Sequence, residues 1–279
     1  MDMYGILTAD RDLARADFGD VTHVFADSVD GTRREPLAGV ANSIACWGDT
    51  ATVRDEPERA AVTADGTRAT PDADGHHWGT VCPTDPDYRA ALLERIERVG
   101  AMGDVRLTTP GFPGASFCHC ERCDREFAAS DHEERDAWRT AVITDFIAAA
   151  AECVEGDLLA TLYPDPYPGN LRERAGVDPG SLAPFVDEFV VPLCDVGYGT
   201  TYWVESLARG FAHELEDLEL DLTIQLSADG VDADRLVGLT QQLEAHADTI
   251  VYGTYPDDAE TVRDVIRRVR EADTPALTV

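Results

Sequence analysis

Short apolar runs rich in β-branched residues recur along the chain and mostly alternate with stretches in which apolar positions repeat at helical spacing. Each run spans four to eight residues and ends in polar residues, which is typical of buried strands. We predict eight strands, at Tyr4–Thr8, Thr22–Ala26, Val40–Trp47, Val105–Thr108, Leu158–Tyr163, Phe189–Cys194, Leu222–Leu226 and Thr249–Tyr252.

The stretches between these runs predict amphipathic helices. One helix begins at Asp85-Pro86, an N-cap followed by proline at the first helical position. Its core face is formed by Tyr88, Leu92, Ile96 and Val99. A second helix has the core face Trp138, Val142, Phe146 and Ala150, and the same face extends to Cys153. Later helices are predicted at Tyr202–Glu216, Ala233–Ala245 and Asp258–Glu271.

Eight strands alternating with helices predict a single (β/α)8 TIM barrel domain over residues 1–279, with a doubly wound open sheet as the alternative. The first two connections, Asp10–Val21 and Ser28–Gly39, leave room only for short helices. Residues 48–81 form the longest irregular stretch, and a loop this long is usually a lid or a binding loop. It follows the third predicted strand.

The charge of the chain is strongly one-sided. There are 54 acidic and 23 basic residues, giving a net charge of −31, and every basic residue is arginine. This composition resembles that of proteins from salt-accumulating halophilic archaea. The acidic excess repels phosphates, so we expect neither nucleic acid nor membranes as partners. Without lysine, Schiff-base chemistry and a Walker-type phosphate loop are excluded.

Targeting signals are also missing from the sequence. The N-terminal residues lack a basic segment followed by an apolar stretch, and no apolar run approaches the roughly 20 residues of a membrane span. We therefore expect a soluble, cytoplasmic protein that acts on a small molecule or an oligosaccharide, and a homo-oligomer is compatible with the sequence. Seven cysteines in a reducing compartment favour metal binding over disulfides.

Four of these cysteines have the spacing of metal ligands. Cys118, Cys120 and Cys123 form a Cys-x-Cys-x-x-Cys cluster after the fourth predicted strand, and Cys82 ends the long loop after the third. Adjacent loops of a barrel bring these thiols together, and four thiolates form a closed structural Zn²⁺ site. The alternative is four unrelated thiols. His119 is a possible substitute ligand, although its position between two cysteines favours an outward side chain. The other cysteines, Cys46, Cys153 and Cys194, are interpreted as buried, inert thiols.

The segment from Trp78 to Phe127 resembles the zinc-binding segment of glycoside hydrolase family 42 β-galactosidases and of uncharacterised glycosidase-like barrels. The resemblance rests on Trp78-Gly-Thr-Val-Cys82-Pro-Thr-Asp-Pro-Asp-Tyr-Arg89 followed by the cysteine cluster. It implies a structural zinc beside the active-site mouth. That family carries an Asn-Glu pair after strand four and a glutamate after strand seven.

Both of these glutamates are missing here. The chain has Thr108-Thr109-Pro110-Gly111 at the first place and Gln225-Leu226-Ser227-Ala228-Asp229 at the second. Because a retaining glycosidase needs two carboxyl groups about 5–5.5 Å apart, the usual catalytic pair is not present at these positions.

Residues at the carboxyl ends of the strands are the remaining candidates, because barrel enzymes place their active sites there. Aspartates that follow strands five to seven are the candidate catalytic acids: Asp165, Asp195 and Asp229. Each could instead serve as a helix cap or a turn residue. Aromatic and amide side chains at these ends are candidates for sugar binding. They are Trp47, Phe112, Tyr163, Tyr167, Tyr198, Tyr202, Gln225 and Tyr252.

The sequence His76-His77-Trp78 lies in the long loop just before Cys82. His76 and Trp78 are candidate substrate contacts, and His77 is a candidate acid or base near neutral pH. We therefore weigh three hypotheses. The first is a divergent glycoside hydrolase that uses aspartates in place of the missing glutamates. The second is a non-catalytic sugar-binding or scaffold barrel, and the third is a lyase or isomerase with a histidine base.

Overall fold

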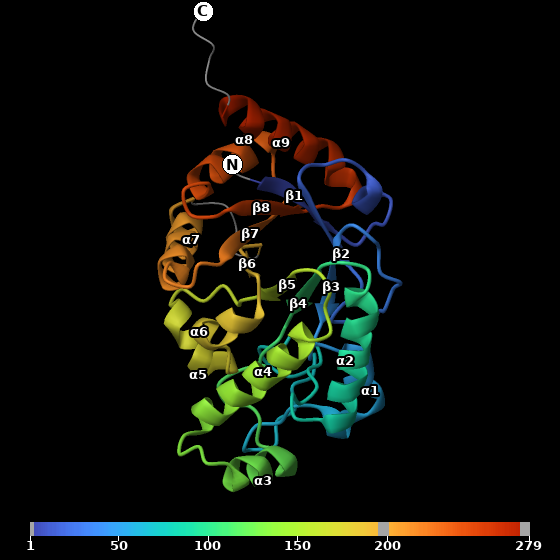
Figure 1. The fold of residues 1–279 in the computed structure, drawn as a ribbon, viewed down its shortest axis with the longest axis vertical. Helices are drawn as coiled ribbons and strands as arrows, with labels where there is room; N and C mark the ends of the chain where they lie inside the picture. The colour runs from blue at the N-terminus through green and yellow to red at the C-terminus, as the bar shows by residue number, and fades with distance from the viewer. Residues whose placement is uncertain (1–2, 195–200, 274–279) are drawn as a thin grey trace, which may run out of the picture.

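The protein forms a closed barrel of eight parallel strands in the order β1 to β8, with β8 paired to β1 (Figure 1). This computed structural model describes residues 3–194 and 201–273. The predicted (β/α)8 architecture is confirmed. The strands are β1 Met3–Thr8, β2 Val21–Phe25, β3 Ala41–Ala45, β4 Val105–Thr108, β5 Leu158–Thr161, β6 Glu188–Pro192, β7 Asp221–Ser227 and β8 Thr249–Gly253.

Helices surround the barrel on its outside (Figure 1). Those of ten or more residues are α2 Pro86–Gly100, α4 Arg135–Ala151, α7 Thr201–Leu215, α8 Ala233–Leu243 and α9 Ala259–Asp273. Shorter ones are α1 Thr50–Asp55, α3 Glu121–Ala129, α5 Leu171–Ala175 and α6 Pro179–Leu182. Single 3-10 turns are η1 Leu13–Arg15, η2 Pro57–Arg59, η3 Pro168–Asn170, η4 Ala183–Phe185 and η5 Pro256–Asp258.

The start of α2 illustrates how the sequence sets a helix boundary. The Asp85 carboxylate accepts a hydrogen bond from the Tyr88 amide, and Pro86 occupies the first turn, where its missing N–H costs nothing. Leu92, Ile96 and Val99 then recur on the buried face. The predicted helix is confirmed at this end and along its core face.

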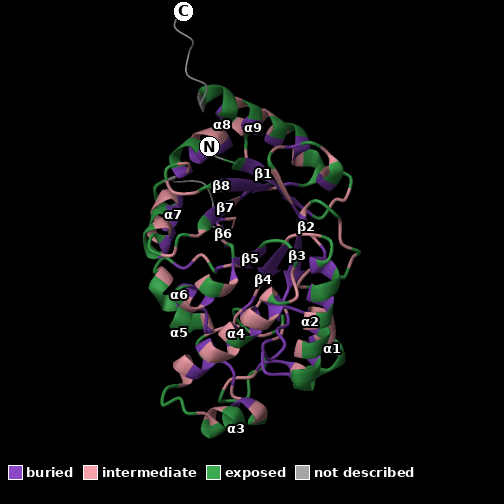
Figure 2. Ribbon diagram, viewed as in Figure 1, coloured by how far each residue is buried: buried purple, intermediate pink, exposed green. Residues whose placement is uncertain are grey.

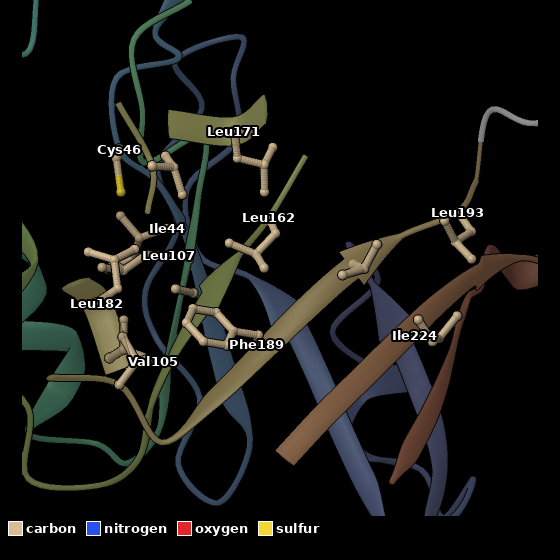
Figure 3. Close-up of a cluster of buried hydrophobic side chains, with 14 of the residues drawn as sticks. Ile44, Cys46, Val105, Leu107, Leu162, Leu171, Leu182, Phe189, Leu193 and Ile224 are labelled. Carbon is tan, nitrogen blue, oxygen red and sulfur yellow. The ribbon is translucent and has the colours of Figure 1, made fainter. Parts of the chain in front are cut away.

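The main apolar core lies between the strands and the helices, and not inside the barrel. Side chains alternate along each strand, so Val105 and Leu107 of β4 point outward into this core while Arg106 points inward. Ile44 and Phe189 belong to the same outward cluster (Figure 3). Figure 2 shows the buried strands enclosed by helices whose outer surfaces are exposed.

Two segments differ from expectation. The long stretch after β3 is more ordered than a loop, since it contains α1 and η2 and forms isolated bridges between Ala60 and Val81 and between Val62 and Arg68. Cys153 was expected on α4, but that helix ends at Ala151 and the Cys153 thiol turns back to donate to the Ala149 carbonyl oxygen, at 3.3 Å.

Within the described ranges, no helix combines the length and apolar character that crossing a bilayer requires.

Candidate metal centre and barrel mouth

The four predicted cysteine ligands meet in one cluster. Their sulfur atoms all lie within 4.8 Å of one another, with 3.4 Å between Cys82 and Cys123 and 3.8 Å between Cys82 and Cys120. A tetrahedron with metal–sulfur bonds of about 2.3 Å has sulfur–sulfur edges of about 3.8 Å. The cluster therefore has the size and donor set of a four-coordinate thiolate metal site.

Backbone amides point at these sulfur atoms. Val62 and Cys120 donate N–H groups to the Cys118 sulfur at 3.3 and 3.4 Å, and Cys123 donates to Cys120 at 3.4 Å. Such donors stabilise thiolates, which are the form that binds metal. Hydrogen bonds from neighbouring thiols, that of Cys118 first, lower the pKa of Cys120. Contacts among the four thiols also raise the pKa of Cys82 and Cys123, so the backbone amides favour negative charge on Cys118 and Cys120.

The cluster joins three parts of the chain that are distant in sequence. Val62 lies in the segment after β3, Cys82 precedes α2, and Cys118 and Cys120 precede α3, which lies at the lower end of the view in Figure 1. Arg135 of α4 donates to the Cys118 carbonyl oxygen at 2.7 Å. His119 lies outside the cluster, with its Nδ1 atom 3.5 Å from an oxygen of Asp124.

The inside of the barrel contains a polar network among apolar side chains. Arg106 is 2% exposed and donates from Nε to the Thr161 hydroxyl at 3.0 Å and from Nη2 to the Gln225 amide oxygen at 2.6 Å. The Gln225 amide nitrogen donates to the Cys194 sulfur at 3.1 Å. Thr161, Cys194 and Gln225 are each partly exposed, so this network lies at the level where the barrel opens.

Several buried polar atoms inside the barrel have no hydrogen-bond partner among the described residues. They are His23 Nδ1, Ser43 Oγ, Arg106 Nη1, Glu188 Oε1, Thr223 Oγ1 and Thr249 Oγ1. Burial lowers the pKa of His23 to about 3 and raises the pKa of Glu188 to about 7. The nearby Thr223 hydroxyl lowers the pKa of Glu188, although the two groups are not in hydrogen-bond geometry. Water or a polar ligand is needed to satisfy these groups.

The raised pKa of Glu188 predicts a pH-dependent stability. Folding favours the protonated carboxyl, so the contribution of Glu188 to stability is fully present below pH 4.5 and is lost as pH rises through about 7. The free energy of unfolding of Glu188→Gln, measured relative to wild type, should therefore rise by roughly 3 kcal/mol between pH 4.5 and pH 8. Chemical unfolding of both proteins at the two pH values measures this. A difference that does not change with pH would contradict the burial of an ionisable group here.

Exposed aromatic side chains follow three strands at the open end of the barrel. Tyr163 follows β5, Trp203 lies at the start of α7 after β6, and Tyr255 follows β8, with exposures of 52%, 44% and 59%. Tyr202, beside Trp203, is 72% exposed. Trp78, in the segment after β3, is partly exposed and lies next to Gly48.

Three predicted sugar-binding residues lie in the core instead. Trp47 is fully buried, donates from Nε1 to the Pro110 carbonyl oxygen at 2.7 Å and packs on Phe146 of α4. Phe112 is 3% exposed and lies beneath the Arg139 guanidinium. Tyr252 points outward and shares a 2.7 Å hydrogen bond with Thr240 of α8. These predictions were wrong because strand-end position alone does not tell which way a side chain points.

The other predicted aromatic and amide residues have mixed placements. Gln225 lies at the barrel opening, as described above. Tyr167 is 72% exposed, but it precedes η3, which packs beside Gly210 in the second half of α7, so it lies toward the outer helices. Tyr198 lies outside the described residues, as does the candidate acid Asp195.

The candidate acids Asp165 and Asp229 have different environments. Asp165 is 7% exposed; its Oδ1 accepts from the Tyr167 amide at 2.9 Å and its Oδ2 lies 3.5 Å from Arg174. It thus closes a local turn, which is the structural role that aspartates often have at strand ends. Asp229 is exposed just after β7. Asp229 is therefore the better placed of the two for contact with a substrate.

The histidine pair lies near the metal cluster. His76 packs edge-on against Phe117 at 5.3 Å between ring centres, and Phe117 directly precedes Cys118. His77 is exposed, and its ring centre is 6.3 Å from that of Trp78. The His76 ring thus packs against Phe117, whereas His77 is accessible to solvent.

The sequence-based prediction missed Arg106 and Thr161. Both lie within predicted strands, where the apolar residues dominate the pattern. The available signal was a single arginine between Val105 and Leu107, since a charge at an inward position of a barrel strand is costly unless it has a partner or a ligand.

No family model matches the sequence, and no curated protein matches it significantly. Solved structures do match the fold. Alpha-L-fucosidase isoenzyme 2 from Paenibacillus thiaminolyticus has a TM-score of 0.69 at 11% identity, and the match covers 98% of this chain. The chain spans only 50% of that fucosidase.

Two further barrels cover more of the compared chain. The glycoside hydrolase domain of PelA from Pseudomonas aeruginosa has a TM-score of 0.53 at 12% identity, covering 92% of this chain and 95% of that one. A family 26 endo-beta-1,4-mannanase from Cellulomonas fimi has a TM-score of 0.51 at 13% identity, covering 98% and 71%. The chain therefore has a barrel fold of the kind found in glycoside hydrolases.

Proposed function

We propose that the protein is a carbohydrate-active barrel that binds a sugar at the carboxyl-terminal opening of its strands. One observation carries this proposal: exposed aromatic side chains, among them Trp203 and Tyr255, follow several strands at the end where Gln225 and Thr161 offer hydrogen bonds. Aromatic rings stack on the C–H faces of sugars, and amides and hydroxyls bind their hydroxyl groups. The likeness to glycoside hydrolase barrels supports the same class of ligand.

The cysteine cluster supports a structural Zn²⁺ ion as part of this proposal. Cys82, Cys118, Cys120 and Cys123 would supply all four ligands, which leaves no position for water or substrate. The ion would hold the segment after β3 against the loop after β4, and Trp78 lies in that segment. The role of the ion would thus be to fix the loops beside the mouth.

Hydrolysis is a second candidate, favoured by the exposed carboxylate of Asp229 after β7. Glutamates are absent from the ends of β4 and β7, and Asp165 is engaged by Tyr167 and Arg174. A hydrolase would therefore pair Asp229 with an acid other than Asp165. Sugar binding without turnover is the simpler function because it needs no such pair.

Replacing two of the exposed aromatic residues at the barrel opening tests the binding proposal. We expect Trp203→Ala combined with Tyr255→Ala to weaken binding of an oligosaccharide by roughly fivefold to 150-fold, because each lost stacking contact contributes about 0.5–1.5 kcal/mol. An array of neutral and acidic oligosaccharides in molar salt identifies a ligand, and calorimetry measures its affinity.

Met102→Ala is the matched control, since Met102 is an exposed apolar residue between α2 and β4, at the opposite end of the barrel. Binding equal in all three proteins would place the site elsewhere, and no binding to any oligosaccharide would remove the proposal. Sugar release in the same samples separates the two candidates. Turnover that is lost in Asp229→Asn supports hydrolysis.

A further inference from the structure

Arg106 is a buried cation without a carboxylate at contact distance. Among the described residues it forms no ion pair within 4 Å, and its two hydrogen-bond acceptors, Thr161 and Gln225, are neutral. Glu188 and Cys194 act on the guanidinium only through space. By contrast, the buried Arg95 donates from Nη2 to the Asp27 carboxylate at 2.7 Å and from Nε to both of its oxygens at 3.2 and 3.3 Å.

A buried charge whose hydrogen-bond acceptors are all neutral is costly. Burial disfavours the charged form and lowers the pKa of Arg106 to about 10, yet the guanidinium still carries its charge near neutral pH. Its Nη1 atom also has no partner among the described residues. Internal water can satisfy that N–H group, but water does not neutralise the charge. The arrangement therefore suits a ligand that brings a negative charge.

We infer that Arg106 receives the anionic group, a carboxylate or a phosphate, of an acidic sugar bound at the mouth. This inference rests on the proposed sugar-binding function and adds the chemical class of the ligand. The anion would replace the Gln225 amide oxygen at Nη2 and also engage Nη1, giving the paired geometry that guanidinium groups offer to carboxylates and phosphates. Thr161 continues to hold Nε in place.

The net charge of −31 does not oppose this site in high salt. At 1 M salt, charges separated by more than about 3 Å in solvent are largely screened, whereas contacts between buried groups are screened much less. The acidic surface thus contributes little at the mouth under those conditions, while the contact with Arg106 is retained. An acidic ligand is therefore compatible with an acidic protein here.

Matched neutral and acidic sugars test the inference in molar KCl. The probes are glucose, galactose and mannose, their uronates and their 6-phosphates, titrated by ligand-observed NMR. We expect the acidic member of at least one set to bind about tenfold to a hundredfold more tightly than its neutral counterpart, as a charged hydrogen bond in a buried site implies. The uronate and phosphate arms distinguish the two kinds of anion.

Two variants assign this preference to Arg106. Arg106→Gln removes the charge, and Gln225→Glu places a carboxylate within reach of the guanidinium, so each should reduce the preference to less than about twofold. Arg209→Gln, which removes an exposed arginine from α7, is the control and should keep it. If Arg106→Gln does not fold, Gln225→Glu decides the question.

The outcomes separate this inference from the proposed function. Equal binding of neutral and acidic sugars would overturn the inference and leave sugar binding intact, and so would a preference that persists in Gln225→Glu. If no sugar binds, here or in the oligosaccharide array, both are overturned. An acidic preference lost in the variants and kept in Arg209→Gln supports both.

Discussion

Cys123→Ser is expected to abolish metal binding at the proposed zinc site and to lower the free energy of unfolding by more than about 4 kcal/mol. Cys123 is fully buried, and its sulfur lies 3.4 Å from that of Cys82. Serine leaves three thiolates and a hydroxyl that binds Zn²⁺ poorly. The segments held by the cluster would then separate. Zinc content of the purified protein and its unfolding by guanidinium measure the two effects.

Cys153→Ser is the control for this experiment. Its thiol is partly buried and bonds to the Ala149 carbonyl oxygen, a contact that a serine hydroxyl can also make. We expect unchanged zinc and a loss of less than about 1 kcal/mol. One zinc per chain that persists in Cys123→Ser would show that the cluster is not the metal site, and wild-type protein without zinc would show that another metal, or none, is bound.

Arg139→Met is expected to destabilise the protein by about 3–5 kcal/mol, because it leaves buried carbonyl groups without donors. Arg139 is fully buried and donates to the carbonyl oxygens of Gly114, Glu173 and Arg174 at 2.8, 2.9 and 3.0 Å. Its guanidinium also lies 4.9 Å above the ring of Phe112. This one side chain therefore joins the loop after β4 to the loop after β5.

Lysine should not rescue this position, because a single ammonium group cannot reach three carbonyl oxygens in the plane of a guanidinium. Arg125→Met, an exposed position on α3, provides the control and should change stability by less than about 0.5 kcal/mol. Denaturation curves of the three variants decide the comparison. Equal curves for Arg139→Met and Arg125→Met would mean that the loops are held by other contacts.

The fold was predictable because local and global patterns agree along this chain. Apolar runs of strand length alternate with capped amphipathic segments, and signals such as Asp85-Pro86 fix a helix start to the residue. The four cysteines were also predictable as a cluster, because soft ligands at short spacing after adjacent strands are typical of a thiolate metal site. The helix start depends on adjacent residues alone, whereas joining Cys82 to the other three cysteines also required the predicted order of the strands.

The mouth was less predictable, because its composition depends on the direction of each side chain. Trp47 and Gln225 both lie near strand ends, yet one is in the core and the other faces the barrel opening. Asp165 is a reasonable acid in sequence, but its turn engages it locally. Arg106 was not predicted because it lies within a strand whose pattern is dominated by apolar residues.

Polar side chains on the inner wall of the barrel also affect how freely the sequence can change there. Its cohesion comes from the outer shell, where Ile44, Leu107 and Phe189 pack beneath helices. Inward positions such as Ser43 and Thr223 contribute little to that shell. Evolution, or a combinatorial library, can therefore vary the inner wall of this barrel to recognise new ligands while the scaffold that carries it stays folded.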